Sequence, residues 1–316
     1  MISLIYSNTK NFGGIRAYSL NLFRELSLAT EAELIPIPKI EATIGKRKIG
    51  GWTSQAMLAP FIRANGLVHS TSHWDLLNST KVVTIHDLFP LVFDYGISDA
   101  ARNFYHRKLR KVQKIAKAII VQGPHIKEQV KKYLDVPVYV IPTKVFTEEP
   151  ESANPYPHDG KIHLLTMGEI MNEQNRKRIF ELYEWLKDNP EIDLYHIGRI
   201  ENMHYRDYAR NIHQLGSVSQ DAKFAYLKYA DKFVFKTIGE GQGIPVMEAM
   251  KLGTQAIVND LPEHRFFLGD KPYYYETKEE FLDAIYRPDK SGQREQISQY
   301  DNWIEKYMKV YEEVGI

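Results

Sequence analysis

The chain of 316 residues contains no cysteine. This absence excludes disulfide bonds, thiolate catalysis and cysteine-ligated zinc or iron–sulfur sites. The sequence also has no stretch near the roughly 18 consecutive apolar residues of a membrane-spanning helix, and its first residues lack the basic-then-apolar pattern of a secretory signal. We therefore expect a cytoplasmic protein.

Motifs that hold metal ions are missing as well. The sequence contains no Asp-x-Asp, no His-Glu-x-x-His and no EF-hand pattern, and its 11 histidines are scattered along the chain. We therefore expect no bound metal.

Charge is distributed unevenly between the two halves of the chain. Residues 1–150 contain 20 Lys and Arg against 12 Asp and Glu, whereas residues 151–316 contain 21 against 28, so the halves carry +8 and −7. At roughly 150 residues per domain, the length also favours two domains. The basic half suits an anionic partner such as a phosphate, a phospholipid surface or a nucleic acid, and charge alone does not choose among them.

Short apolar runs rich in β-branched residues alternate with segments of helical spacing. Such alternation is typical of parallel sheets covered on both faces, so we predict an α/β fold with two doubly wound, Rossmann-like domains. The predicted strands are 2–6, 32–37, 66–70, 81–86, 118–122 and 138–142, then 162–167, 193–198, 211–215, 232–237, 254–259 and 272–276. The predicted helices are 15–29, 100–117, 124–134, 176–187, 219–230, 244–252 and 277–287.

A segment that resembles a linker separates the two series of strands. Residues 143–160 are rich in Pro, Glu, Ser and Asn and poor in apolar residues. We therefore place the first domain at 1–150 and the second at 151–292. Two such domains can face each other across a cleft, and ligands bind at the carboxyl ends of the strands of such sheets. Motifs at strand ends are therefore the candidates for function.

Residues 239–250, which read GEGQGIPVMEAM, follow a predicted strand. The glycines permit a tight turn and Pro245 suits a first helical turn, so the backbone N–H groups of 241–244 are expected to converge on an anion. Glu240 in the loop and Glu248 on the helix are acceptors suited to sugar hydroxyls. The alternative from spacing alone is a helix-capping glycine loop in which Glu248 is solvated.

This segment resembles the signature E-G-x-G-x-P-x-x-E-A-M of family 4 retaining glycosyltransferases of the GT-B fold, with Gln242 in place of the commoner Phe. The resemblance implies that Glu240 binds hydroxyls of the transferred sugar and that Glu248 binds the nucleotide ribose. It implies that backbone amides between them bind the diphosphate. The residues that carry these amides are Gly241, Gln242, Gly243 and Ile244.

The resemblance extends over essentially the whole chain. It includes Val218, after the predicted strand 211–215, as a donor-binding residue. It also implies that the last helix, about 293–316, crosses back to the first domain. A nucleotide sugar is then a substrate, and we expect no cofactor.

Two motifs in the first half match the same family. Gly13, Gly14 and Arg16 lie between a predicted strand and helix, where a glycine turn lets the backbone approach a donor phosphate. An ordinary surface turn is the alternative. His86 and Asp87 end an apolar strand, and the alternative to a functional role is a partly buried His86 hydrogen-bonded to Asp87. The resemblance implies that His86 lies beside the donor sugar, and we assign it positioning and electrostatic support.

Arg176 and Lys177 open the predicted helix 176–187, where a cation can neutralise the leaving nucleoside diphosphate. The pair matches the Arg-Lys-Asn variant of the family. In the other common variant an arginine directly follows the strand glycine, and Glu169 occupies that position here. The alternative is a solvated basic helix start.

The glycine spacing also fits a different class of enzyme. Gly239, Gly241 and Gly243, with Asp260 at the end of the next strand, fit a dinucleotide-binding turn of an NAD-dependent enzyme. That turn normally follows the first strand of a domain, whereas this one follows the fourth. The NAD interpretation also leaves the two glutamates without roles.

Basic clusters account for much of the charge of the first half. One comprises Lys46, Arg47 and Lys48, with apolar residues after it, and another lies at 107–117. No nucleic-acid-binding module signature accompanies them, so we expect no nucleic-acid partner. The functional hypothesis is contact with anionic lipid headgroups at the inner face of a membrane, or with an anionic or lipid-linked acceptor. The alternative is a solvated helix face.

The function predicted from these motifs is sugar transfer from a nucleotide sugar to an unidentified acceptor, with retention of anomeric configuration. The alternative is a catalytically silent nucleotide-sugar-binding protein on the same fold. Turnover separates the two, because a silent protein binds the nucleotide sugar without releasing the nucleotide.

Overall fold

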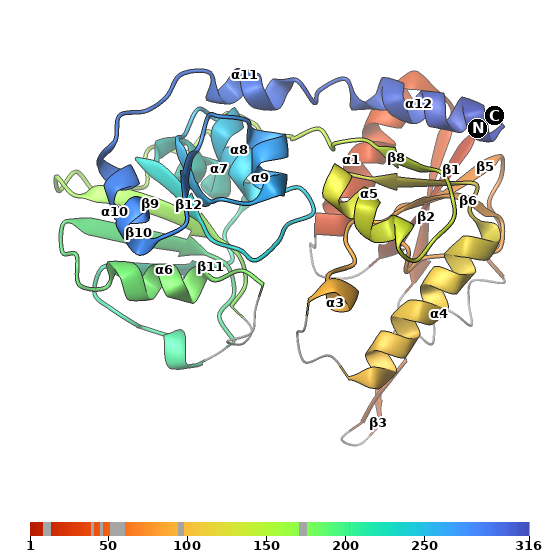
Figure 1. The fold of residues 1–316 in the computed structure, drawn as a ribbon, viewed down its shortest axis with the longest axis horizontal. Helices are drawn as coiled ribbons and strands as arrows, with labels where there is room; N and C mark the ends of the chain where they lie inside the picture. Colours follow the sequence, from red (N-terminus) through yellow and green to blue (C-terminus); the bar gives the residue numbers. More distant parts are fainter. Residues whose placement is uncertain are drawn as a thin grey trace. The chain divides into compact units, whose positions relative to one another are not determined.

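The computed structural model describes residues 1–8, 14–38, 41–44, 47–50, 61–93, 98–170, 176–201 and 203–315. The chain divides into two compact units, a first unit of Met1–Thr143 with Asn302–Ile316 and a second unit of Lys144–Asp301 (Figure 1). Each unit contains a six-stranded parallel sheet, which confirms the predicted α/β fold. The unit boundary follows Thr143, whereas the sequence placed it after residue 150.

The first sheet has the spatial order β2-β1-β5-β6-β7-β8. Its strands lie within three residues of the predicted limits, because short β-branched runs buried on both faces mark parallel strands well. The strands are β1 (Ile2–Asn8), β2 (Ala32–Pro38), β5 (Leu67–Ser70), β6 (Thr80–Thr84), β7 (Ala118–Val121) and β8 (Val138–Val140).

Helices cover both faces of this first sheet. Val83 and Ile85 belong to a core cluster with residues of α4 and α5, whereas Thr84, between them, is hydrogen-bonded to Tyr18 of α1. The hydroxyls of Tyr18 and Tyr307 are 2.6 Å apart and join α1 to α12. In the described part of the unit the α-helices are α1 (Gly14–Ala29), α3 (Phe89–Val92), α4 (Asp99–Ile115), α5 (Pro124–Lys131) and α12 (Trp303–Val314).

The second sheet has the spatial order β11-β10-β9-β12-β13-β14, and its strands also match the six predicted ones. Taken in chain order within the unit this is 3-2-1-4-5-6, the order of a dinucleotide-binding fold. The strands are β9 (Ile162–Met167), β10 (Ile192–Ile197), β11 (Ile212–Gly216), β12 (Lys232–Phe235), β13 (Ala256–Asn259) and β14 (Tyr273–Tyr275).

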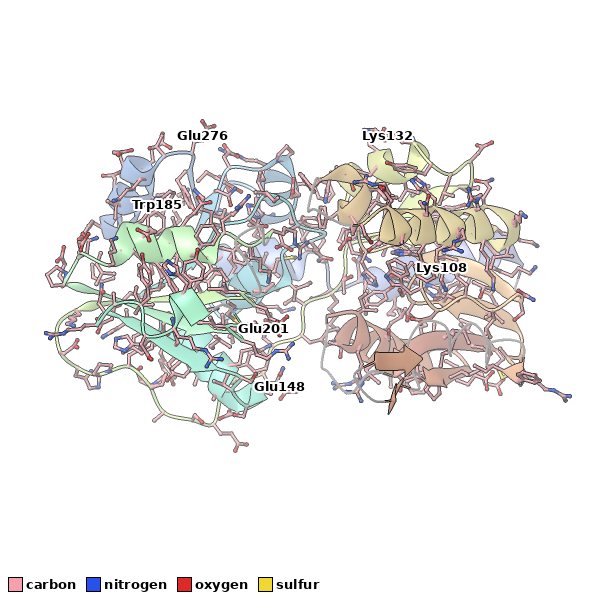
Figure 2. All side chains as sticks on the ribbon, turned by 90° about the horizontal axis from the view of Figure 1, so that it is seen from below. Lys108, Lys132, Glu148, Trp185, Glu201 and Glu276 are labelled. Carbon is pink, nitrogen blue, oxygen red and sulfur yellow. The ribbon has the colours of Figure 1, made fainter. Side chains whose placement is uncertain are left out.

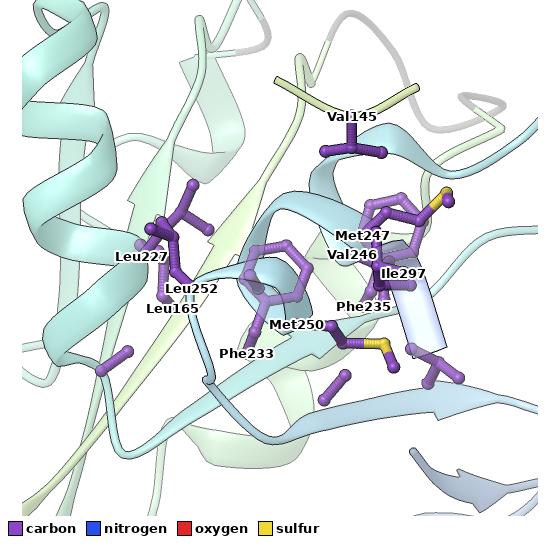
Figure 3. Packing of buried hydrophobic residues seen from close by; sticks show 14 of the residues in the cluster. Val145, Leu165, Leu227, Phe233, Phe235, Val246, Met247, Met250, Leu252 and Ile297 are labelled. Atoms are coloured by element: carbon purple, nitrogen blue, oxygen red, sulfur yellow. The ribbon is translucent and has the colours of Figure 1, made fainter. Parts of the chain in front are cut away.

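Two apolar layers enclose the second sheet. On one face, Phe233 and Phe235 of β12 pack in a cluster with Val246 and Met250 (Figure 3). Residues of α7 and α9 belong to the same cluster. Val234 points to the opposite face, where α6 and α10 complete the core. The helices are α6 (Ile179–Leu186), η2 (Met203–Tyr205), α7 (Gln220–Tyr229), α8 (Ile244–Lys251), α9 (Pro262–Leu268), α10 (Lys278–Tyr286) and α11 (Gln293–Ser298).

The prediction of a single helix at about 293–316 is wrong, because the chain forms two helices there, α11 and α12, with a break between them. Tyr300, in the break, packs into the core of the second unit, and Asp301 accepts a hydrogen bond from Lys251 at 2.6 Å. These contacts hold the break in the second unit, so only α12 belongs to the first. An antiparallel pair, β3 (Glu41–Ile44) and β4 (Arg47–Gly50), and the helix α9 were also not predicted.

Candidate functional site

The segment 239–250 begins in the loop after β12. β9 and β12 are neighbours, with β10 and β11 beyond β9 and with β13 and β14 beyond β12. The loops that follow β9 and β12 therefore flank the topological switch point, where open α/β sheets bind ligands. The segment follows the fourth strand of its unit, unlike a dinucleotide fingerprint, which follows the first.

The glycines of this loop set up the start of α8. Gly243 is the N-cap residue and adopts the left-handed conformation with φ 76° and ψ 44°, which favours glycine. Pro245 occupies the first turn, where its missing N–H costs nothing. Gly241 and Ile244 are partly buried beside it. Because the N–H groups that open a helix lack intrahelical acceptors, this end of α8 is electropositive.

Glu240 is buried in the loop, with an exposed fraction of 6%. Its backbone N–H donates to Oε1 of Glu263 at 3.0 Å, and its Oε2 lies 3.6 Å from Nη1 of Arg176. Gln242 is also buried, and its Nε2 lies 3.4 Å from Sδ of Met247. The loop thus holds a buried carboxylate next to the predicted cation Arg176.

Lys177 lies beside the loop that follows β12. Its backbone forms an antiparallel bridge with Thr237, and its Nζ is 5.3 Å from the centre of the Phe235 ring. A Cβ added to Gly168 would lie 2.5 Å from Cδ of Lys177, so the glycine at the end of β9 makes room for this side chain. Burial lowers the pKa of Lys177, and the charge of Glu240 opposes that shift.

The helix predicted to begin at Arg176 begins instead at Ile179. The N–H of Arg178 donates to the carbonyl of Lys236, and the N–H of Ile238 donates to the carbonyl of Arg176, both at 3.0 Å. These bonds keep the first basic residues extended beside the loop after β12. The two cations therefore lie next to that loop and not on a solvated helix start.

Glu248 is buried on α8, so the alternative in which it is solvated is wrong. Its Oε1 accepts a hydrogen bond from Nζ of Lys223 on α7 at 2.8 Å. Burial raises the pKa of Glu248, and Lys223 opposes that shift. Val218, which precedes α7, packs against the core of the unit. Sequence analysis missed Lys223 and Glu263, because each meets its partner only through the tertiary fold.

His86 follows β6 in the first unit. Its Nε2 donates to the carbonyl of Thr71 at 2.9 Å, and its ring meets the Tyr18 ring edge-on, with centroids 4.7 Å apart. Burial lowers the pKa of His86 to about 4, although the hydrogen bond to the Thr71 carbonyl opposes that shift. His86 is therefore neutral at pH 7, and the bond to Thr71 fixes the proton on Nε2. Its partner is Thr71, and not Asp87 as in the alternative interpretation.

The remaining predicted donor-binding residues are placed as follows. Gly14 is the first residue of α1, and Arg16 is partly buried in its first turn. Gly13 lies outside the described residues. Asp260, central to the NAD alternative, forms two hydrogen bonds to Arg265, at 2.8 Å and 2.6 Å.

The basic clusters lie in the first unit. Arg47 and Lys48 lie on β4, and their side chains and the whole of Lys46 are outside the described part of the chain. Lys108 lies on α4 (Figure 2). Its Nζ donates to the carbonyl of Trp74 at 2.8 Å. Four further cations of α4 line a shallow surface hollow with Asn78 and Ile115. They are Arg107, Arg110, Lys111 and Lys114.

Solved structures with the same fold cover the chain from end to end. Sucrose-phosphate synthase from Thermosynechococcus elongatus matches with a TM-score of 0.72 and 14% identity, covering 99% of this chain and 98% of that one. WaaG, a glycosyltransferase involved in lipopolysaccharide biosynthesis, matches with a TM-score of 0.70 and 15% identity, covering 98% of this chain and 99% of that one. HepE from Anabaena, in complex with UDP and glucose, matches with a TM-score of 0.65 and 11% identity, covering 99% of this chain and 98% of that one.

These similarities define the chain as an α/β protein of the GT-B glycosyltransferase fold. Residues 148–280, which lie within the second unit, match the model of the family described as glycosyl transferases group 1. This confirms the resemblance found in the sequence. A comparison with curated proteins found no match. None of the helices in the described ranges is long and apolar enough to cross a membrane.

Proposed function

We propose that the protein is a retaining glycosyltransferase that moves a sugar from a nucleotide-sugar donor to an acceptor. The observation that carries the proposal is the pair of buried glutamates, Glu240 and Glu248, on either side of the electropositive start of α8. A buried carboxylate needs partners, and each has a cation nearby, Arg176 or Lys223. The family match within the second unit supports the same function.

Each group has a role in this proposal. Glu248 accepts hydrogen bonds from the nucleotide ribose, while Lys223 restrains its carboxylate. Glu240 accepts hydrogen bonds from the transferred sugar. The amides of 241–244, with Arg176 and Lys177, stabilise the charge on the leaving diphosphate, as preorganised donors do where charge develops. The predicted position of His86 beside the sugar stays a prediction.

The acceptor is proposed to be anionic or lipid-linked. The basic hollow on α4 supports an anionic partner, because clustered cations attract one at long range. Peripheral contact with the inner face of a membrane, through Lys46, Arg47 and Lys48, is the corresponding proposal for localisation.

A panel of nucleotides and nucleotide sugars tests the function. A donor present at 100 times its dissociation constant stabilises the fold by about 2.7 kcal/mol, which a thermal shift detects. The donor found in this way should then be turned over, with release of nucleotide and with a product of unchanged anomeric configuration by NMR. Transfer should continue in EDTA. Binding without nucleotide release would instead support the silent alternative.

A further inference from the structure

A second polar cluster lies at the amino edge of the second sheet, opposite the edge that carries the segment 239–250. His163 and Asp193 are the second residues of β9 and β10 and are paired in register, so their side chains share one face. Asp159 lies four residues before His163, in the segment that precedes β9. One ligand atom from each of the three residues lies within 4.8 Å of the other two.

His163 is the unusual member of this cluster. Its exposed fraction is 6%, yet its buried Nε2 makes no hydrogen bond to any described residue. That nitrogen lies 3.3 Å from Oδ1 of Asp159, and Nδ1 lies 3.9 Å from Oδ2 of Asp231. Asp231 itself accepts the backbone N–H of His163 at 2.7 Å. Buried polar nitrogens are almost always bonded, so a further partner for Nε2 is expected here.

The charges of the cluster favour a cation. Lys161 donates to Oδ1 of Asp193 at 3.0 Å, and Nε2 of His213 lies 3.4 Å from Oδ2 of the same carboxylate. The carboxylates of Asp159, Asp193 and Asp231 outnumber the one ammonium, that of Lys161, by two charges. Asp193 has an exposed fraction of only 3%, so solvent screens it poorly.

Aromatic rings fix the imidazoles of the cluster. Tyr156 stacks on His163 with ring centres 5.2 Å apart, and Tyr195 stacks on His213 at 4.5 Å. Tyr156 and Tyr195 meet edge-on at 4.8 Å. Rings held by their neighbours keep their donor atoms in place, which is what a metal site requires.

We infer that Asp159, His163 and Asp193 form a site for a divalent transition metal, with zinc as its best occupant. One imidazole nitrogen and two carboxylate oxygens suit zinc at about 2.0–2.2 Å, with water as a fourth ligand. Asp231, close to Nδ1 of the imidazole, is the outer partner that orients such a ligand. The metal would join the segment before β9 to the starts of two neighbouring strands. No sequence motif marks the site, because its ligands come from segments far apart in the chain.

Calorimetric titration of Zn²⁺ into the metal-stripped full chain tests the site. The wild type should bind one equivalent of Zn²⁺. His163→Gln and Asp193→Asn should each lose about 100-fold or more in affinity, because loss of an outer partner alone costs at most about 100-fold. Asp231→Asn should lose about tenfold. His204→Gln, at an exposed histidine of the same unit, is the matched control and should bind as the wild type does.

Lys161→Met is a second test whose expected result is a gain in zinc affinity. A variant that fails to fold cannot produce such a gain. Lys161 competes for Asp193, so its removal should tighten zinc binding by about tenfold. Co²⁺ should give the strong visible absorption of a tetrahedral site in the wild type and not in His163→Gln. No saturable binding, or equal affinity in wild type and His163→Gln, would overturn the site. Both outcomes are independent of nucleotide-sugar binding, which occurs at the other edge of the sheet.

Discussion

The two units have sheets of the same kind, yet the histidines beside β5 and β6 differ in charge from the glutamates that follow β12. In the first unit, burial lowers the pKa values of His69, His73 and His86 to about 3, 3 and 4, so these groups are neutral at pH 7. In the second unit, Glu240 and Glu248 pair with cations. A shared fold therefore does not determine the ligand. The charged carboxyl edge of the second unit is the one suited to a charged donor.

The comparison of the two units requires that each has its own hydrophobic core. Trp303 of α12 is 1% exposed in the first unit, and Phe281 of α10 is fully buried in the second. Either change to Ala should cost about 3–5 kcal/mol in the unit that contains it. Calorimetry should show a lowered transition for a different unit in each variant. A shift of one and the same transition by both variants would show that the units do not unfold separately.

Acid should weaken the first unit through its neutral histidines. Nδ1 and Nε2 of His69 are hydrogen-bonded to Tyr311 and Thr84, both at 2.8 Å. Because the unfolded chain takes up a proton near pH 6.5 and folded His69 only near pH 3, the free energy of unfolding falls as pH drops through this window. By pH 4 the loss is about 3 kcal/mol from this group.

His69→Gln provides the comparison, because glutamine has a donor and an acceptor but does not titrate. Denaturation at pH 7 and pH 4 should show a smaller pH-dependent loss in the variant than in the wild type. An equal loss in both proteins would show that His69 is not the group responsible.

Glu240→Gln should separate transfer from nucleotide binding. The variant loses the charged acceptor for the sugar, worth about 1.5–3 kcal/mol, or roughly 10- to 150-fold in transfer rate. Its affinity for the free nucleoside diphosphate should stay close to that of the wild type. Kinetics and calorimetry on the same preparation check this, and a parallel loss of both properties would argue for a structural role.

The smallest expected effect per substitution concerns the basic cluster at residues 46–48. Each Lys or Arg near an anionic membrane contributes about 1 kcal/mol, so changing Lys46, Arg47 and Lys48 to Ser should reduce vesicle binding stepwise. Co-sedimentation with neutral and anionic vesicles at low and high salt measures it. If the wild type ignores anionic vesicles at low salt, these charges serve solubility alone and the acceptor is soluble or protein-bound.

Local pattern predicted most of the fold, because each buried parallel strand shows as a short β-branched run. It correctly placed Glu240 on a loop and Glu248 on a helix. It failed where distant residues decide the structure. The start of α6 depends on pairing with the loop after β12, and the Lys223–Glu248 ion pair joins two helices 25 positions apart along the chain. Such contacts leave no periodic signal in the sequence.

The central claim is that the second unit holds a nucleotide through Glu248. Calorimetric titration with the nucleoside diphosphate of the best donor should show one site in the wild type. Affinity should fall about 10- to 150-fold in Glu248→Gln and stay unchanged in the control His204→Gln. Unchanged affinity in Glu248→Gln, with the variant folded, would contradict the account.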